Sequence, residues 1–146
     1  MRMLGRRCGM YSNDPETIWH IDSAMEYAED QMGSAGKYFG QIMSGKTPDD
    51  EGIESLWLCT ENLCKMLERR LSASGKQFVA GTDKPTVADI KIFTMISNLV
   101  LNPKSPMTVQ QKTIMKSRID RYQAASRWIN ITMMQAVGDY TIKTAF

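Results

Sequence analysis

The chain has 146 residues, enough to bury a hydrophobic core without disulfides or a structural metal. Its formal net charge of +2 is too small to indicate a nucleic-acid-binding protein, and no apolar run approaches the length of a membrane span. The chain has three cysteines, Cys8, Cys59 and Cys64. Because an odd number cannot all pair within the chain, we expect reduced thiols in a cytoplasmic compartment.

The first 13 residues are basic and contain no acidic side chain before Asp14. Such a start is also found in mitochondrial transit segments, which leaves a mitochondrial location as an alternative. Asp14 followed by Pro15 predicts a helix start. Beyond it, apolar residues recur at spacings of three and four, which predicts one long helix with a single apolar stripe: Ile18, Ile21, Met25, Ala28, Met32, Ala35 and Phe39. Gly33, Gly36 and Gly40 weaken its far end, so they either admit another backbone or mark a bend.

The stretch Gly40–Thr47 matches the phosphate-loop pattern G-x-x-x-x-G-K-[ST], which would indicate nucleotide binding. Its context argues against that function, because a helical stripe precedes it instead of a buried strand. The acidic run Pro48–Glu51 follows it, where a phosphate would be repelled. We therefore treat nucleotide binding through Gly40–Thr47 as a remote alternative.

Apolar residues at helical spacing predict a second long helix that ends before Gly75: Ile53, Leu56, Trp57, Leu63, Cys64, Leu67 and Leu71. Thr86 and Asp89 are then spaced as a capping box, with the Asp89 carboxylate reaching back to the Thr86 amide. The residues from Val87 to Leu101 are apolar on nearly every side, so this helix should be buried until it breaks at Asn102–Pro103.

Two more helices are expected near the end of the chain. Ser105–Pro106 should start the first, which carries Val109, Met115, Ile119 and Tyr122, and Ser126 should cap the second, which carries Trp128, Ile131 and Met134. The sequence thus predicts an all-α bundle of five or so helices. His20 is the only histidine, which excludes a His-rich metal site and a His-based catalytic triad, and we expect no metal.

The capping box on a buried helix resembles the C-terminal helical domain of glutathione transferases. The stretch Leu4–Tyr11, with Asp14–Pro15 after it, resembles the family's passage from its thioredoxin-like half into its helical half. Further on, Ile119–Tyr122 and Arg127–Ile129 are similar to the family's Asp-x-Tyr-Pro…Trp segment, with Gln123 in place of the proline. The resemblance implies that residues 14–146 form a single helical domain and that residues 1–13 are the remnant of an interdomain linker helix.

In this family the glutathione site and the catalytic residue lie in the thioredoxin-like half, so the resemblance transfers no catalytic residue and no cofactor to this chain. It implies a non-catalytic interaction or structural subunit of a larger assembly. The alternative is one half of a split glutathione transferase, for which glutathione would be the cofactor. Glu26 matches a family position that reaches the glutathione of a partner subunit, although a solvated helix carboxylate is the simpler interpretation.

Without the thioredoxin-like half, the surface that it covers in the family should be free for another protein chain or for a second copy of this chain. On that basis the resemblance implies an interface at Met3, Leu4, Met10, Val87 and Lys91. Trp19 lies beside the apolar stripe of the first long helix and extends the predicted interface.

Overall fold

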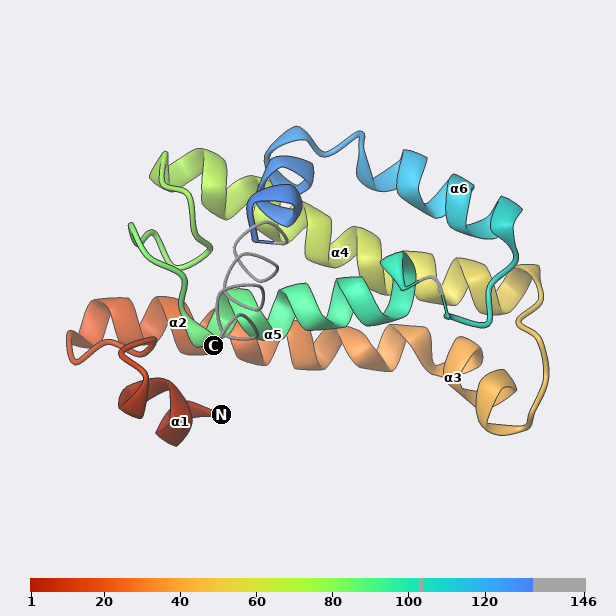
Figure 1. The fold of residues 1–146 in the computed structure, drawn as a ribbon, viewed down its shortest axis with the longest axis horizontal. Coiled ribbons are helices and arrows are strands. Elements are labelled where there is room, and N and C mark those ends of the chain that lie inside the picture. Colours follow the sequence, from red (N-terminus) through yellow and green to blue (C-terminus); the bar gives the residue numbers. More distant parts are fainter. Residues whose placement is uncertain (103, 133–146) are drawn as a thin grey trace, which may run out of the picture.

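The computed structural model describes residues 1–102 and 104–132, which contain helices and no strand (Figure 1). The all-α prediction is therefore confirmed for this part of the chain. The helices are α1 (Arg2–Arg7), α2 (Pro15–Gln31), α3 (Gly36–Met43), α4 (Asp50–Ser74), α5 (Val87–Ile96) and α6 (Val109–Ile119). Residues 123–132 are also helical, and Met134, which was expected on this helix, lies outside the described residues.

The predicted start of α2 is confirmed, because Asp14 Oδ2 accepts a hydrogen bond from the Thr17 amide at 2.8 Å and Pro15 is the first helical residue. The prediction of one continuous helix as far as Phe39 is wrong. A 3₁₀ turn, Met32–Ala35, separates α2 from α3. A Cβ added at Gly33, Gly36 or Gly40 would have no neighbouring atom within 4 Å, so these glycines admit no other backbone. Gly33 lies in the 3₁₀ turn and Gly36 starts α3, so these two mark the break, because glycine disfavours the α-helix; Gly40 lies within α3.

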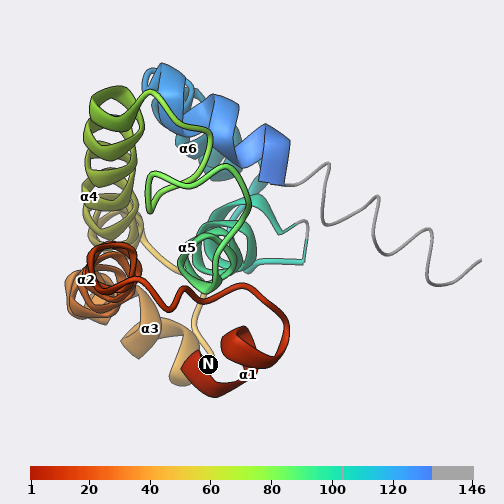
Figure 2. The same cartoon turned by 90° about the vertical axis from the view of Figure 1, so that its left-hand side faces the viewer.

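Helix α4 packs against α2, α3 and α6 and supplies much of the core. Asp49 caps its start by accepting a hydrogen bond from the Gly52 amide at 2.8 Å, and Gly75 ends it at a φ of 62°. That left-handed conformation favours glycine, which explains the predicted end of the helix. Viewed along the bundle in Figure 2, α2, α4 and α5 surround a common interior, with α1 folded back beneath α5.

Helix α5 is buried on the side formed by Val87, Ala88, Asp89, Ile92 and Ile96. Its burial is less complete than predicted, because Ile90 and Thr94 are exposed. A turn of π-helix, Ser97–Leu101, continues α5, and the chain becomes extended at Asn102. An extended residue is expected before a proline, although Pro103 itself is outside the described residues.

The two predicted starts in the C-terminal part are wrong by a few residues. Helix α6 begins at Val109, because the Thr108 hydroxyl accepts from the Gln111 amide at 3.2 Å and Gln111 Oε1 accepts from the Thr108 amide at 2.9 Å. This capping box is a stronger local signal than Ser105–Pro106. The last helical segment begins at residue 123, so Ser126 lies inside it and does not cap it.

Candidate functional site

Helix α1 is held against the start of α5 by a backbone approach that only glycine allows. A Cβ added at Gly5 would lie closer than 3.0 Å to Val87 Cγ1, and Val87 is buried as a result. The Val87 amide donates to the Met10 carbonyl at 3.0 Å, so the connector after α1 also caps the first turn of α5. These contacts fix the position of α1 on the bundle.

Charged side chains join α1 to α2. Arg2 Nε donates to Asp22 Oδ1 at 2.9 Å and its guanidinium donates to Glu26 Oε1 at 2.5 Å, while the Tyr11 hydroxyl donates to Asp22 Oδ1 at 2.8 Å. Burial alone would raise the pKa of Asp22, but the bonds from Arg2 and Tyr11 lower it below its usual value. Asp22 is therefore ionised at neutral pH and keeps both partners. The Arg6 guanidinium lies over the Tyr11 ring, 5.1 Å from its centroid.

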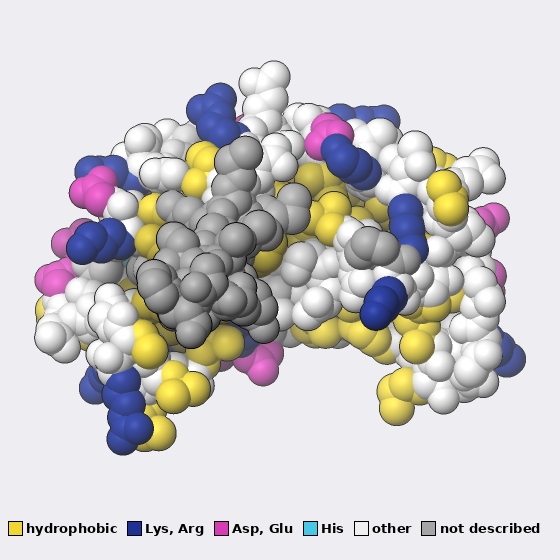
Figure 3. All heavy atoms as spheres, viewed as in Figure 1, with side chains coloured by type: hydrophobic (Ala, Val, Ile, Leu, Met, Phe, Trp, Pro, Cys, Tyr) yellow, Lys and Arg dark blue, Asp and Glu magenta, His cyan; other side chains and the backbone are white. Residues whose placement is uncertain are grey.

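Of the residues predicted at the interface, Met3, Leu4 and Trp19 are 60–67% exposed. Met10 is only partly exposed, and the prediction that Val87 is uncovered is wrong, because α1 itself covers it. Lys91 is mostly buried and donates to Glu29. Met1, Met3 and Leu4 are all exposed and form what we call the α1 patch, which Figure 3 shows at lower left beside basic side chains.

A cavity of about 380 Å³ lies where α1 meets α2 and α5. Its lining combines methionine side chains with charged groups: Met1, Arg2, Met3, Met25, Glu26, Glu29 and Lys91. The charged groups are paired with one another, since Arg2 bonds Glu26 and Lys91 bonds Glu29. The Glu26 carboxylate, which the family resemblance relates to glutathione, is thus occupied by an arginine of its own chain. Its role toward glutathione stays a prediction.

The predicted capping box of α5 belongs to a larger cluster around Asp89, which is fully buried. Asp89 Oδ2 accepts from the Thr86 amide at 2.9 Å and from the Thr86 hydroxyl at 2.8 Å. Asp89 Oδ1 accepts from the Val79 amide and from Trp128 Nε1, both at 2.9 Å. One carboxylate therefore joins the start of α5 to the preceding loop and to the last helical segment.

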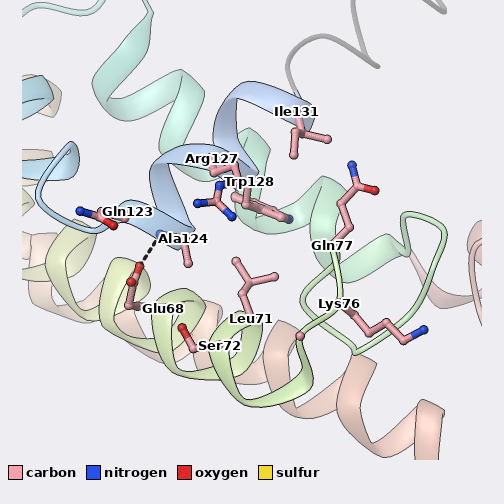
Figure 4. Close-up of a pocket in the computed structure, with 11 residues that line it drawn as sticks. Glu68, Leu71, Ser72, Lys76, Gln77, Gln123, Ala124, Arg127, Trp128 and Ile131 are labelled. Atoms are coloured by element: carbon pink, nitrogen blue, oxygen red, sulfur yellow. Dashed lines mark hydrogen bonds between the residues drawn. The ribbon is translucent and has the colours of Figure 1, made fainter.

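A second cavity, of about 460 Å³, lies between the end of α4, the loop after it and helical residues 123–132 (Figure 4). Leu71 and Trp128 form part of its apolar wall, and Arg127 lies at its edge. Beside it, Glu68 Oε2 accepts from the amides of Ala124 and Ala125 at 2.8 and 3.1 Å. Glu68 is therefore the cap of the last helical segment, the role that the sequence assigned to Ser126.

Replacing Glu68 with alanine is expected to lower the free energy of unfolding by about 1–2 kcal/mol, the usual cost of a lost helix cap. The matched variant Glu68→Gln keeps an acceptor oxygen but loses the charge, so it should lose less. Urea unfolding followed by circular dichroism measures both. Equal stability of Glu68→Ala and the unmodified chain would contradict the capping role.

The described residues offer little catalytic or cofactor chemistry. They contain no group of side chains suited to a metal ion, and no helix among residues 1–102 and 104–132 is long and apolar enough to cross a membrane. Burial raises the pKa of Cys59 to about 11 and that of Cys64 to about 12, so neither thiol is a ready nucleophile at neutral pH.

The first part of the phosphate-loop match, Gly40–Met43, is helical, so the loop after a strand that this motif requires is not formed.

The comparisons with known proteins identify one family. Its model, described as the glutathione S-transferase C-terminal domain, matches residues 58–127. No curated protein and no solved structure matches the chain. The matched segment contains most of α4, all of α5 and α6, the Thr86–Asp89 box and the capping residue Glu68, while α1, α2 and α3 precede it.

Proposed function

We propose that this chain, which belongs through residues 58–127 to the family of glutathione S-transferase C-terminal domains, is a non-catalytic interaction or structural subunit of a larger protein assembly. The observation that carries the proposal is the α1 patch, three large apolar side chains at 60–67% exposure on a helix that is itself firmly held. Contiguous exposed apolar side chains on a folded domain mark interaction sites.

The geometry around α1 supports a preformed docking surface. Gly5 fixes the helix against Val87, and Arg2 ties it to Asp22 and Glu26 on α2. A partner that covers Met3 and Leu4 therefore has little ordering entropy to overcome. Burial of this apolar surface contributes about 25 cal/mol per Å². The occupant we propose is another protein chain or a second copy of this one.

The composition of the described chain supports a role without catalysis. The ring of His20, the one histidine, packs edge-on against Trp19 with the centroids 4.9 Å apart. Cys59 and Cys64 are buried, and Cys8 is exposed as a free thiol. Free thiols also support the cytoplasm as the compartment we propose.

The test is Leu4→Asp, which places a charge in the α1 patch. We expect association to weaken at least tenfold, because the buried contact would have to desolvate a carboxylate, while the melting temperature stays nearly unchanged. Native mass spectrometry and light scattering measure association. Val109→Asp is the matched control, since Val109 is 82% exposed and begins α6, where an acidic residue is favoured.

Two results would contradict the proposal. One is that the chain stays monomeric at high concentration and that affinity capture, followed by identification of the bound proteins, finds none that forms a stable complex with it. The other is glutathione conjugation by the purified chain that disappears in Glu26→Ala, which would favour the split glutathione transferase. Calorimetric titration with glutathione and a conjugation assay decide the second question directly.

A further inference from the structure

Arg70 is a partly buried cation whose hydrogen bonds go to neutral oxygen atoms. Its two terminal nitrogens donate to the His20 carbonyl and to Ser23 Oγ, both at 3.0 Å. Ser23 in turn donates to the His20 carbonyl at 3.3 Å, so this arrangement joins α4 to α2 without a carboxylate. Partly buried arginines usually pair with an acidic group, because an uncompensated charge is costly to desolvate.

The surrounding charges do not compensate Arg70. Burial, and then the positive charge of Arg69, lower the pKa of the Arg70 guanidinium, which still remains protonated at neutral pH. In the adjacent loop, Asp83 already pairs with Lys76 at 2.8 Å. Arg70 also lies outside the last turn of α4, where the helix dipole would favour a cation. Within the described chain, its charge thus has no acidic partner.

Arg70 lines a cavity of about 270 Å³ between the first part of α2, the end of α4 and the loop after α4. These segments lie at one end of the bundle in Figure 1. Most of the lining is apolar or small, and it comes from three separate segments: His20, Arg70, Ala73, Ser74, Val79, Ala80 and Gly81. A guanidinium at the wall of an apolar hollow matches a ligand with one carboxylate and a short hydrocarbon part.

We propose that Arg70 and this cavity form a binding site for a carboxylate carried on a short apolar group. The carboxylate is supplied by a free small acid or by an acidic side chain of a partner protein, and Arg70 binds it through the guanidinium. The site is separate from the α1 patch and does not depend on the interaction role proposed above.

The experiment is a titration of the isotopically labelled full chain with butyrate, followed by NMR at constant ionic strength. Butyramide is the matched neutral probe. We expect butyrate to shift the amide signals of Val79, Ala80 and Gly81 and the Arg70 Nε–H signal, and butyramide to leave them in place. Arg70→Gln should raise the Kd for butyrate about tenfold, the effect of losing a charge-assisted hydrogen bond. Arg69→Gln removes the same charge from an exposed neighbour and should change the Kd little.

Equal shifts with butyramide, or equal weakening by Arg69→Gln and Arg70→Gln, would overturn the proposal. If Arg70→Gln does not fold, Ala73→Leu tests the same site, because the added side chain fills the cavity and leaves Arg70 in place. Unchanged butyrate binding in Ala73→Leu would also overturn it. A short blocked peptide with a single glutamate separates the two sources: tighter binding than butyrate identifies a protein partner, and weaker binding a free acid.

Discussion

Replacing Asp89 with alanine is expected to lower the free energy of unfolding by about 4 kcal/mol. The substitution leaves the Thr86 amide, the Val79 amide and Trp128 Nε1 without their acceptor in a fully buried place. Each unsatisfied buried donor costs about 1–3 kcal/mol. A domain of this size is typically stable by about 5–15 kcal/mol, so the variant should be marginal. Urea unfolding followed by circular dichroism and tryptophan fluorescence measures the loss.

Two comparisons isolate the cause. Thr86→Ala removes the cap hydroxyl alone and should cost about 1–2 kcal/mol. Asp83→Ala removes a carboxylate that is 82% exposed in its ion pair and should cost less than about 0.5 kcal/mol. Similar small losses for Asp89→Ala and Thr86→Ala would mean that Asp89 is only a helix cap and that the bonds to Val79 and Trp128 contribute nothing.

The local part of this cluster was predictable from the sequence, and the rest was not. Thr86 and Asp89 are three residues apart, so the capping box is a short-range pattern. Trp128 is far along the chain from Asp89, and the bond between them depends on how helical residues 123–132 pack. For the same reason the capping role of Glu68 could not be predicted, because its hydrogen bonds to the amides of Ala124 and Ala125 join residues 56 and 57 positions apart in the sequence. The signal available in the sequence was the position of Asp89 in a helix that is otherwise largely apolar and predicted to be buried.

The errors in helix boundaries have local causes. The Thr108–Gln111 box is the same kind of signal as the box at Thr86, and it outweighs Ser105–Pro106 as a start. The apolar stripe between Ile18 and Phe39 keeps its period through the 3₁₀ turn Met32–Ala35, so periodicity alone did not show the break. The glycines there did, since one of the two interpretations they allowed was a bend.

The resemblance to glutathione transferases predicted the fold but placed Val87 on a free surface. That expectation assumed that a missing thioredoxin-like half leaves the start of α5 bare. In the structure, the chain's own α1 occupies the place, because Gly5 brings its backbone against Val87 and Met10 accepts from the Val87 amide. At this end of the bundle, Met3 and Leu4 of α1 are consequently exposed, whereas Val87 at the start of α5 is buried.

Gly5→Ala should therefore destabilise the chain and release α1. The added Cβ would lie closer than 3.0 Å to Val87 Cγ1, so either α1 or α5 has to move, and we expect a loss of about 1–3 kcal/mol, as for other overpacked contacts. Gly40→Ala is the matched control, because nothing lies within 4 Å of its added Cβ in α3 and alanine should stabilise that helix by about 0.5–1 kcal/mol.

Hydrogen exchange at the Val87 amide reports the release directly, since its acceptor is the Met10 carbonyl in the connector after α1. Exchange at Val87 should accelerate in Gly5→Ala and stay unchanged in Gly40→Ala. Because the α1 patch depends on the position of α1, Gly5→Ala should also weaken association, although no exposed residue has changed. A gain in stability in both variants would contradict the close packing of α1 on α5. Unaltered association despite faster exchange at Val87 would show that the partner does not require a fixed α1.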